Sequence, residues 1–251
     1  MTQQELISLE NVAKSYAGRQ VLAPLSLAVP AGATTVLIGE SGCGKSTLLR
    51  LVLGLLRPDH GRIVFDGAEL TAGNADEIRH RIGYVVQDGG LFPHLTAVCN
   101  VTLLARFLRR PHEWMDARVA ELSALVRIER QTLERYPRDL SGGQRQRIGL
   151  MRALMLDPPV LLMDEPLGAL DPITRSELQQ ELKAIFERLR KTVIMVTHDM
   201  NEAAHFAGRI VVLREGRVIQ QGSLEDLLQR PAEPYVREFI RAQAGRLAGI
   251  A

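Results

Sequence analysis

The segment that most constrains the fold is a glycine-rich loop, Gly39-Glu40-Ser41-Gly42-Cys43-Gly44-Lys45-Ser46. It follows an apolar run and precedes a helical pattern that begins at Thr47, which is the context of a phosphate-binding P-loop. In such a loop, backbone N–H groups turn towards phosphate oxygens, the lysine reaches the β- and γ-phosphates and the serine hydroxyl is a ligand for Mg²⁺. We therefore expect residues 39–47 to bind ATP, with Lys45 taking part in the reaction and Ser46 binding the metal. A chance glycine-rich turn is the alternative.

Apolar runs along the chain predict two kinds of strand. Leu6–Leu9 and Ile63–Phe65 are short, lie between turn residues and predict an antiparallel lobe. Three other runs lack polar alternation, as strands buried on both faces of a parallel sheet do. These runs are Thr35–Ile38, Val160–Met163 and Val193–Thr197. The sequence therefore predicts an α/β fold with a parallel sheet and a separate antiparallel lobe.

Helical patterning dominates from about Ala97 to Leu156 and predicts a helical subdomain inserted into the α/β core. The length allows one large domain or two small ones. We expect a single domain over 1–251, with its core at about 1–88 and 157–230. The helical subdomain is expected at about 89–156, and a short C-terminal tail at 231–251.

Acidic residues follow the second parallel run. Asp164 is expected to bind Mg²⁺, and Glu165, one residue farther on, to orient and deprotonate the attacking water. The alternative is an acidic turn that merely ends a strand. His198 follows the third run, at the edge where open α/β sheets bind ligands, and is expected to contact the γ-phosphate. A structural histidine is the alternative.

A second glycine-rich segment precedes another helical run. In Leu140-Ser141-Gly142-Gly143-Gln144, the serine and the glycine amides at a helix start predict another anion site. The alternative is an ordinary serine N-cap. The arginines of the following helix, Arg145, Arg147 and Arg152, are expected to form a solvated face, and a nucleic-acid patch is the alternative.

These motifs, in this order over nearly the whole chain, make the sequence resemble an ABC cassette, an ATPase with a P-loop NTPase core. The resemblance implies that Gln87 is the glutamine that binds Mg²⁺ and takes part in catalysis. It also implies that Asp171, in the segment Gly168–Asp171, lies at the nucleotide, and that Tyr16 stacks on adenine. For Tyr16, packing within the β lobe is the alternative.

The same resemblance implies the partners. In the family, the segment 140–144 of one subunit closes over ATP held by the other, so we expect a head-to-tail homodimer, or a pair with a similar cassette. Transmembrane permease subunits would bind the cassette, and a solute-binding protein would act through them. ATP and Mg²⁺ are the cofactors implied.

Charge and cysteine content bear on location. The formal charge is +2, from 31 Lys+Arg and 29 Asp+Glu, so no basic excess indicates nucleic-acid binding. Cys43 and Cys99 provide no disulfide framework, which is typical of a reducing compartment. The longest apolar stretch, Leu48–Leu56, is too short to span a bilayer. We expect a cytoplasmic protein on the inner face of the cell membrane. Cys43, near a helix start, is either a reactive thiol or a small loop residue.

The transported solute is the least constrained property. The segment Gly90–Thr96 resembles bacterial importer subunits, and Arg81–Phe92 and Leu167–Pro172 resemble the quaternary-amine and osmoprotectant group, which includes importers of glycine betaine and choline. The alternatives are an importer for another small solute, or a non-transport ABC ATPase that acts on nucleic acid.

Overall fold

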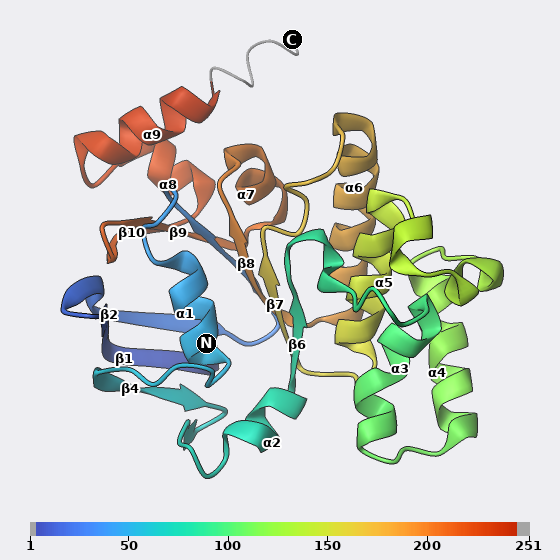
Figure 1. Cartoon of the computed structure of the whole chain (residues 1–251). Helices are drawn as coiled ribbons and strands as arrows, with labels where there is room; N and C mark the ends of the chain where they lie inside the picture. Colours follow the sequence, from blue (N-terminus) through green and yellow to red (C-terminus); the bar gives the residue numbers. More distant parts are fainter. Residues whose placement is uncertain (1–3, 245–251) are drawn as a thin grey trace. The chain divides into compact units, whose positions relative to one another are not determined.

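The structure is a computed structural model that describes residues 4–244, and the chain divides into two compact units (Figure 1). The first unit contains the chain up to Arg79 and from Arg190 onwards, and the second contains His80–Leu189. The helical subdomain predicted at about 89–156 lies within the second unit. Its separation from a core that continues at 157 stays a prediction.

The first unit contains a four-stranded antiparallel sheet. Its order is β2-β1-β4-β5, with β1 at Glu5–Tyr16, β2 at Arg19–Pro30, β4 at His60–Phe65 and β5 at Ala68–Glu69. The predicted antiparallel lobe is thus confirmed. β1 continues beyond the predicted end at Leu9 as far as Tyr16. Asn11, at φ 51°, forms an irregularity between the paired positions Leu9 and Val12, and the strand resumes after it. Such a bulge breaks the alternation from which the strand length was predicted.

The first unit also contains a mixed group of strands in the order β10-β9-β3-β8. Parallel pairs place β3 (Thr34–Ile38) between β8 (Thr192–Thr197) and β9 (Arg209–Arg214), and β10 (Arg217–Gly222) runs antiparallel to β9. The central residues of β3 and β8 are fully buried. Two of the predicted parallel strands are therefore confirmed as neighbours.

In the described part of the first unit, five helices accompany these strands. Ser223 caps α8 by accepting a hydrogen bond from the backbone of Asp226. In the segment predicted as a tail, α9 packs against α7 and α8 and buries Val236 and Ile240. Residues 245–251 of that tail lie outside the described part. The helices are α1 (Lys45–Val52), α2 (Ala75–His80, which ends at the boundary), α7 (Met200–Phe206), α8 (Leu224–Gln229) and α9 (Pro234–Ala244).

The second unit combines two parallel strands with helices. β6 (Ile82–Val85) pairs with β7 (Val160–Asp164), which confirms the remaining predicted strand. The helices α3, α4 and α5 contact one another and confirm the predicted helical stretch (Figure 1). The helical segments are η1 (Gln87–Gly90), α3 (Ala97–Phe107), α4 (His112–Leu125), η2 (Arg130–Glu134), η3 (Pro137–Asp139), α5 (Gly142–Leu154) and α6 (Pro172–Leu189).

Candidate functional site

The loop between β3 and α1 is built around the ammonium group of Lys45. The side chain is buried, and its Nζ donates to the carbonyl oxygens of Gly39, at 2.8 Å, and of Glu40, at 3.0 Å. Gly44 has φ 108°, and a Cβ there would lie 2.4 Å from a methyl group of Leu22. Only glycine fits at this position, which is why the loop can wrap around its own lysine.

The start of α1 has no side-chain cap. Its N-cap is Gly44, so the first backbone N–H groups of the helix receive no side-chain hydrogen bond from that residue. Uncapped N–H groups at a helix start, together with the helix dipole, favour an anion. Ser46 and Thr47 occupy the first turn and are half-buried, whereas Glu40, Ser41 and Gly42 are exposed at the top of the loop.

The same sheet edge carries His198. The parallel register pairs Ile38 of β3 with Thr197 of β8, so the P-loop and His198 both begin at the carboxyl ends of neighbouring strands. Thr197 Oγ1 donates to Glu202 at 2.6 Å and accepts from the backbone of Asp199 at 3.0 Å. These bonds fix the chain on either side of His198, whose side chain is exposed. The first unit thus places the histidine at the P-loop edge, as predicted.

The second unit gathers the acidic pair and the glutamine at the ends of β6 and β7. Val85 is paired with Met163, so Gln87 and the pair Asp164 and Glu165 follow adjacent strand ends. The hydroxyl of Tyr84 lies 3.4 Å from Asp164 Oδ2. This tyrosine was not predicted as a site residue. Its proximity to the Asp164 carboxylate depends on how β6 and β7 pair, which the sequence alone does not reveal.

Glu165 has a left-handed backbone. Its φ is 45°, and its carbonyl accepts a hydrogen bond from the backbone of Gly168 at 3.2 Å, which closes a turn. A non-glycine residue in this region costs about 1 to 2 kcal/mol and persists where the surroundings hold it.

The segment 140–144 starts α5 with a complete capping box. Ser141 Oγ accepts from the backbone of Gln144 at 3.2 Å, and Gln144 Oε1 accepts from the backbone of Ser141 at 2.9 Å. The N-cap alternative is therefore correct for the Ser141 side chain, and an anion site at the exposed Ser141, with Gly142 and Gly143, stays a prediction.

Asp171 caps the next helix, α6. It accepts from the backbone of Thr174 at 3.1 Å, and hydrogen bonds from the Thr174 side chain and backbone lower the pKa of the Asp171 carboxyl.

The two remaining predicted residues differ in exposure. Tyr16 ends β1 with 40% of its surface exposed and with Lys14 Nζ 5.8 Å from its ring centroid, and its stacking on adenine stays a prediction. Cys43 is 5% exposed, and its Sγ lies 3.7 Å from Lys45 Nζ. A buried thiol is a poor target for bulky reagents, and this favours the interpretation of Cys43 as a small loop residue.

The expected solvated arginine face on α5 is wrong. Arg145 donates to the carbonyl of Leu140 at 2.8 Å, and Arg147 pairs with Glu181 at 2.8 Å. Arg152 is half-buried and donates to two loop carbonyls, and burial lowers the pKa of its guanidinium. Its setting among apolar residues, 148–156, is the sequence signal that could have indicated burial.

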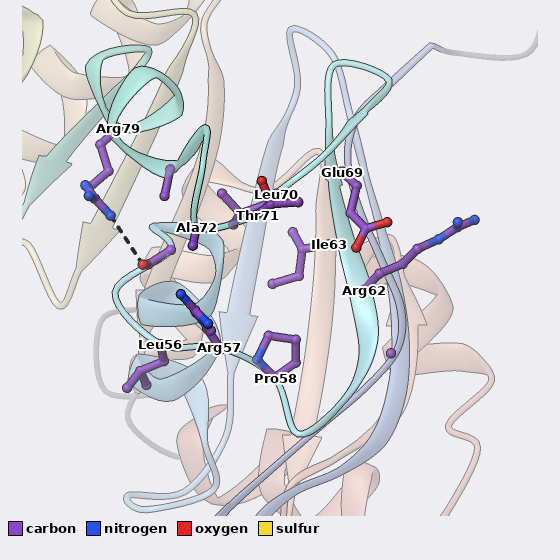
Figure 2. Close-up of a pocket in the computed structure, with 13 residues that line it drawn as sticks. Leu56, Arg57, Pro58, Arg62, Ile63, Glu69, Leu70, Thr71, Ala72 and Arg79 are labelled. Carbon is purple, nitrogen blue, oxygen red and sulfur yellow. Dashed lines mark hydrogen bonds between the residues drawn. The ribbon is translucent and has the colours of Figure 1, made fainter.

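One hollow of the first unit, about 460 Å³, has none of the predicted site residues in its lining (Figure 2 shows the residues that line it). Arg62 on its wall pairs with Glu10 outside it at 2.7 Å, and Arg79 donates to the carbonyl of Gly54 at 3.2 Å, the dashed line in Figure 2. Two of its guanidinium groups are thus engaged within the protein, and the hollow has no part in the site described above.

The geometry agrees with comparisons to known proteins. The family model for ABC transporters matches residues 22–168, and the chain belongs to this family. It is 45% identical over 236 residues to a glycine betaine/carnitine/choline transport ATP-binding protein of Bacillus subtilis, covering 94% of this chain and 62% of the relative. It is 43% identical over 241 residues to the ATP-binding protein of a glycine betaine uptake system of Escherichia coli, covering 96% and 78%. The chain thus spans less than two thirds of the Bacillus relative.

Solved structures show the same fold. A dimeric ATP-binding cassette bound to ADP and Pi superposes with a TM-score of 0.78 at 35% identity, covering 87% of this chain and 98% of that one.

Proposed function

We propose that this chain is the ATP-binding and ATP-hydrolysing subunit of an ABC importer. The observation that carries this proposal is the P-loop, in which a buried lysine ammonium binds loop carbonyls and the helix that follows starts without a side-chain cap. ATP would bring phosphate oxygens to both. Phosphoryl transfer requires little covalent chemistry from the protein, so positioning and charge stabilisation are the tasks left to the side chains.

Each predicted residue then has a definite task. Lys45 holds the β- and γ-phosphates, Glu165 orients the attacking water and accepts its proton, and His198 contacts the γ-phosphate. Tyr16 has an exposed ring on which adenine would stack.

The residues proposed for Mg²⁺ fit that ion. Ser46, Asp164 and Gln87 offer hydroxyl, carboxylate and amide oxygens, which are the donors that a hard cation prefers. Within residues 4–244 no cluster of three or more His, Cys, Asp or Glu side chains could hold a metal. Few protein ligands suit Mg²⁺, because it keeps several waters and binds phosphate oxygens of the substrate. The ion would neutralise charge that develops on those oxygens.

The active form is proposed to be a head-to-tail dimer in which Ser141, Gly142, Gly143 and Gln144 of one subunit close over ATP held by the other. Two helix starts that each follow a glycine-containing segment in one chain, and a dimeric cassette among the solved relatives, support this arrangement.

A membrane subunit is the proposed partner of the second unit. Its apolar hollow of about 460 Å³ has Leu103 and Phe107 on its wall, and Phe107 is 78% exposed. An exposed apolar side chain beside a hollow is typical of a docking surface. In the described part of the chain no helix is both long and apolar enough to cross a bilayer. We propose that the protein lies on the inner face of the cell membrane, bound to permease subunits through this hollow.

The proposed cargo is a quaternary amine such as glycine betaine or choline, supported by the names of the relatives. The decisive experiment is ATPase activity of the reconstituted complex. Cargo-loaded binding protein should stimulate this activity. Free cargo added to this subunit alone should leave its ATPase activity unchanged. Quaternary ammonium groups favour a cage of aromatic side chains, and aromatic residues make up only 4% of the chain. If another class of solute stimulates the ATPase activity, the proposed cargo is wrong. If nucleic acid alone stimulates it, the proposal that the chain belongs to an importer is wrong.

A further inference from the structure

The loop that carries Gln87 is tied to α5 by one side chain. Arg152, on α5, donates through Nη1 to the carbonyl oxygen of Gly90 and through Nη2 to that of Gly89, each at 2.8 Å. No carboxylate among the described residues pairs with this guanidinium. Its half-buried charge is therefore balanced by two backbone dipoles, and both belong to the residues that follow Gln87 and Asp88.

The backbone of this loop needs such support. Asp88, Gly89 and Gly90 all have positive φ, at 57°, 73° and 53°. A left-handed aspartate is unfavourable by about 1 to 2 kcal/mol, and consecutive left-handed residues persist only where tertiary contacts hold them.

The loop lies directly on the backbone of α5. A Cβ on Gly149 would stand 2.8 Å from the Cα of Gly89, and a Cβ on Gly89 would stand 2.5 Å from the carbonyl oxygen of Arg145. No side chain fits between the two backbones. Glycine contacts provide proximity without direction, whereas the two hydrogen bonds from Arg152 fix the orientation of both peptide planes.

Gln87 itself has an exposed side chain, so packing does not determine where it points. We propose that Arg152 is a positioning residue that holds Gln87 in the orientation used for hydrolysis. This inference rests on the proposed role of Gln87 at ATP. Arg152 also lines the apolar hollow beside Phe107, so a partner seated there would reach the side chain that orients the glutamine.

The test is a double-mutant cycle on ATPase kinetics. Gln87→Ala and Arg152→Gln should each lower kcat by about tenfold or more while KM for ATP changes by less than about twofold, since a small misplacement costs turnover rather than ground-state binding. The double variant should lose no more than the more affected single variant, because both changes remove the same contribution. Arg152→Lys, which keeps a donor for one carbonyl, should retain an intermediate kcat.

Arg118→Gln is the matched control. Arg118 is also a half-buried arginine of the second unit, and it donates to the carbonyl of Leu154 at 3.0 Å and pairs with Glu121 and Asp157. It supports the end of α5 without touching the Gln87 loop. Its replacement should lower the melting temperature by as much as Arg152→Gln does and leave kcat within about twofold.

Each remaining outcome is decisive. A folded Arg152→Gln variant with normal kcat, beside an impaired Gln87→Ala variant, overturns the positioning role and leaves the proposed function intact. Losses that multiply in the double variant also overturn it, since independent sites add in free energy. A normal kcat for Gln87→Ala removes Gln87 from the reaction and the positioning role with it. If Arg152→Gln does not fold, a normal kcat for Arg152→Lys or an impaired one for Arg118→Gln overturns the inference.

Discussion

Lys45 donates a hydrogen bond of 2.8 Å from its ammonium group to the carbonyl oxygen of Gly39, six residues earlier in the chain. The loop thereby holds a cation in place before any phosphate arrives. Phosphate oxygens carry more charge than peptide carbonyls and form stronger bonds with an ammonium group. The lysine therefore stabilises both the loop and bound ATP.

Lys45→Ala should weaken both. Loss of charge-assisted hydrogen bonds predicts about a 100-fold fall in ATP affinity and a loss of about 1 to 3 kcal/mol in the free energy of unfolding. Nucleotide titration and urea denaturation measure the two effects. Unchanged ATP affinity would contradict the assignment of this loop as the phosphate site.

Glu165→Gln should keep ATP affinity within about twofold and lower turnover by about 10² to 10⁴, because the amide preserves shape but accepts no proton. Glu215→Gln is the control, since Glu215 is another glutamate with a left-handed backbone, at φ 48°, and its side chain is exposed. Steady-state ATPase and nucleotide binding are measured on both variants. Comparable turnover of the two would remove Glu165 from the reaction.

Ser141→Arg should prevent the ATP-dependent dimer of the Glu165→Gln protein. The arginine side chain is larger than that of serine and would occupy the space in which the γ-phosphate of ATP held by the partner subunit is proposed to bind. Ser223→Arg is a matched control: both serines cap helices through capping boxes, so each change costs about 1 kcal/mol of stability. Light scattering with and without Mg-ATP reports the dimer. Equal dimer formation by the two variants would exclude a shared site.

Tyr235 should titrate unusually late. Burial, with the nearby Glu40 carboxylate, raises its pKa to about 12, and the Arg214 guanidinium lies 4.2 Å from its ring centroid. The folded-state pKa exceeds the ordinary value of 10.0, so the stabilisation is complete below pH 10 and is lost as pH rises through about 12. Phenolate absorbance of the protein and of Tyr235→Phe, recorded against pH, isolates this group among the four tyrosines. A difference curve centred near pH 10 would refute the shift.

The sequence predicted those parts of the fold that local pattern determines. The three buried strands were found because uninterrupted apolar runs such as Val193–Thr197 occur where both faces of a strand are covered. β1 was predicted too short, because its bulge at Asn11 interrupts the alternation. The fold of α9 was missed, since its few apolar residues gain burial only from the tertiary contacts of Val236 and Ile240.

The candidate site divides in the same way. Lys45, Asp164 and His198 were predicted because each follows a recognisable strand. Tyr84 and Arg152 were not assigned, because their roles depend on register and on contacts between segments distant in sequence. The sequence pattern is the same for an arginine on the solvent-exposed face of a helix and for one that donates to loop carbonyls. Only the packing of the helix against the loop distinguishes the two.

The packing of α9 has a practical consequence for protein engineering. A variant truncated after residue 230, where the core was expected to end, would lack α9. The apolar residues of α7 and α8 that α9 covers would then be exposed to water. We expect such a truncated protein to aggregate during purification, whereas a truncation after Ile240 keeps the buried residues Val236 and Ile240. Crystallisation trials and tag placement should therefore treat this helix from Pro234 to Ile240 as part of the first unit.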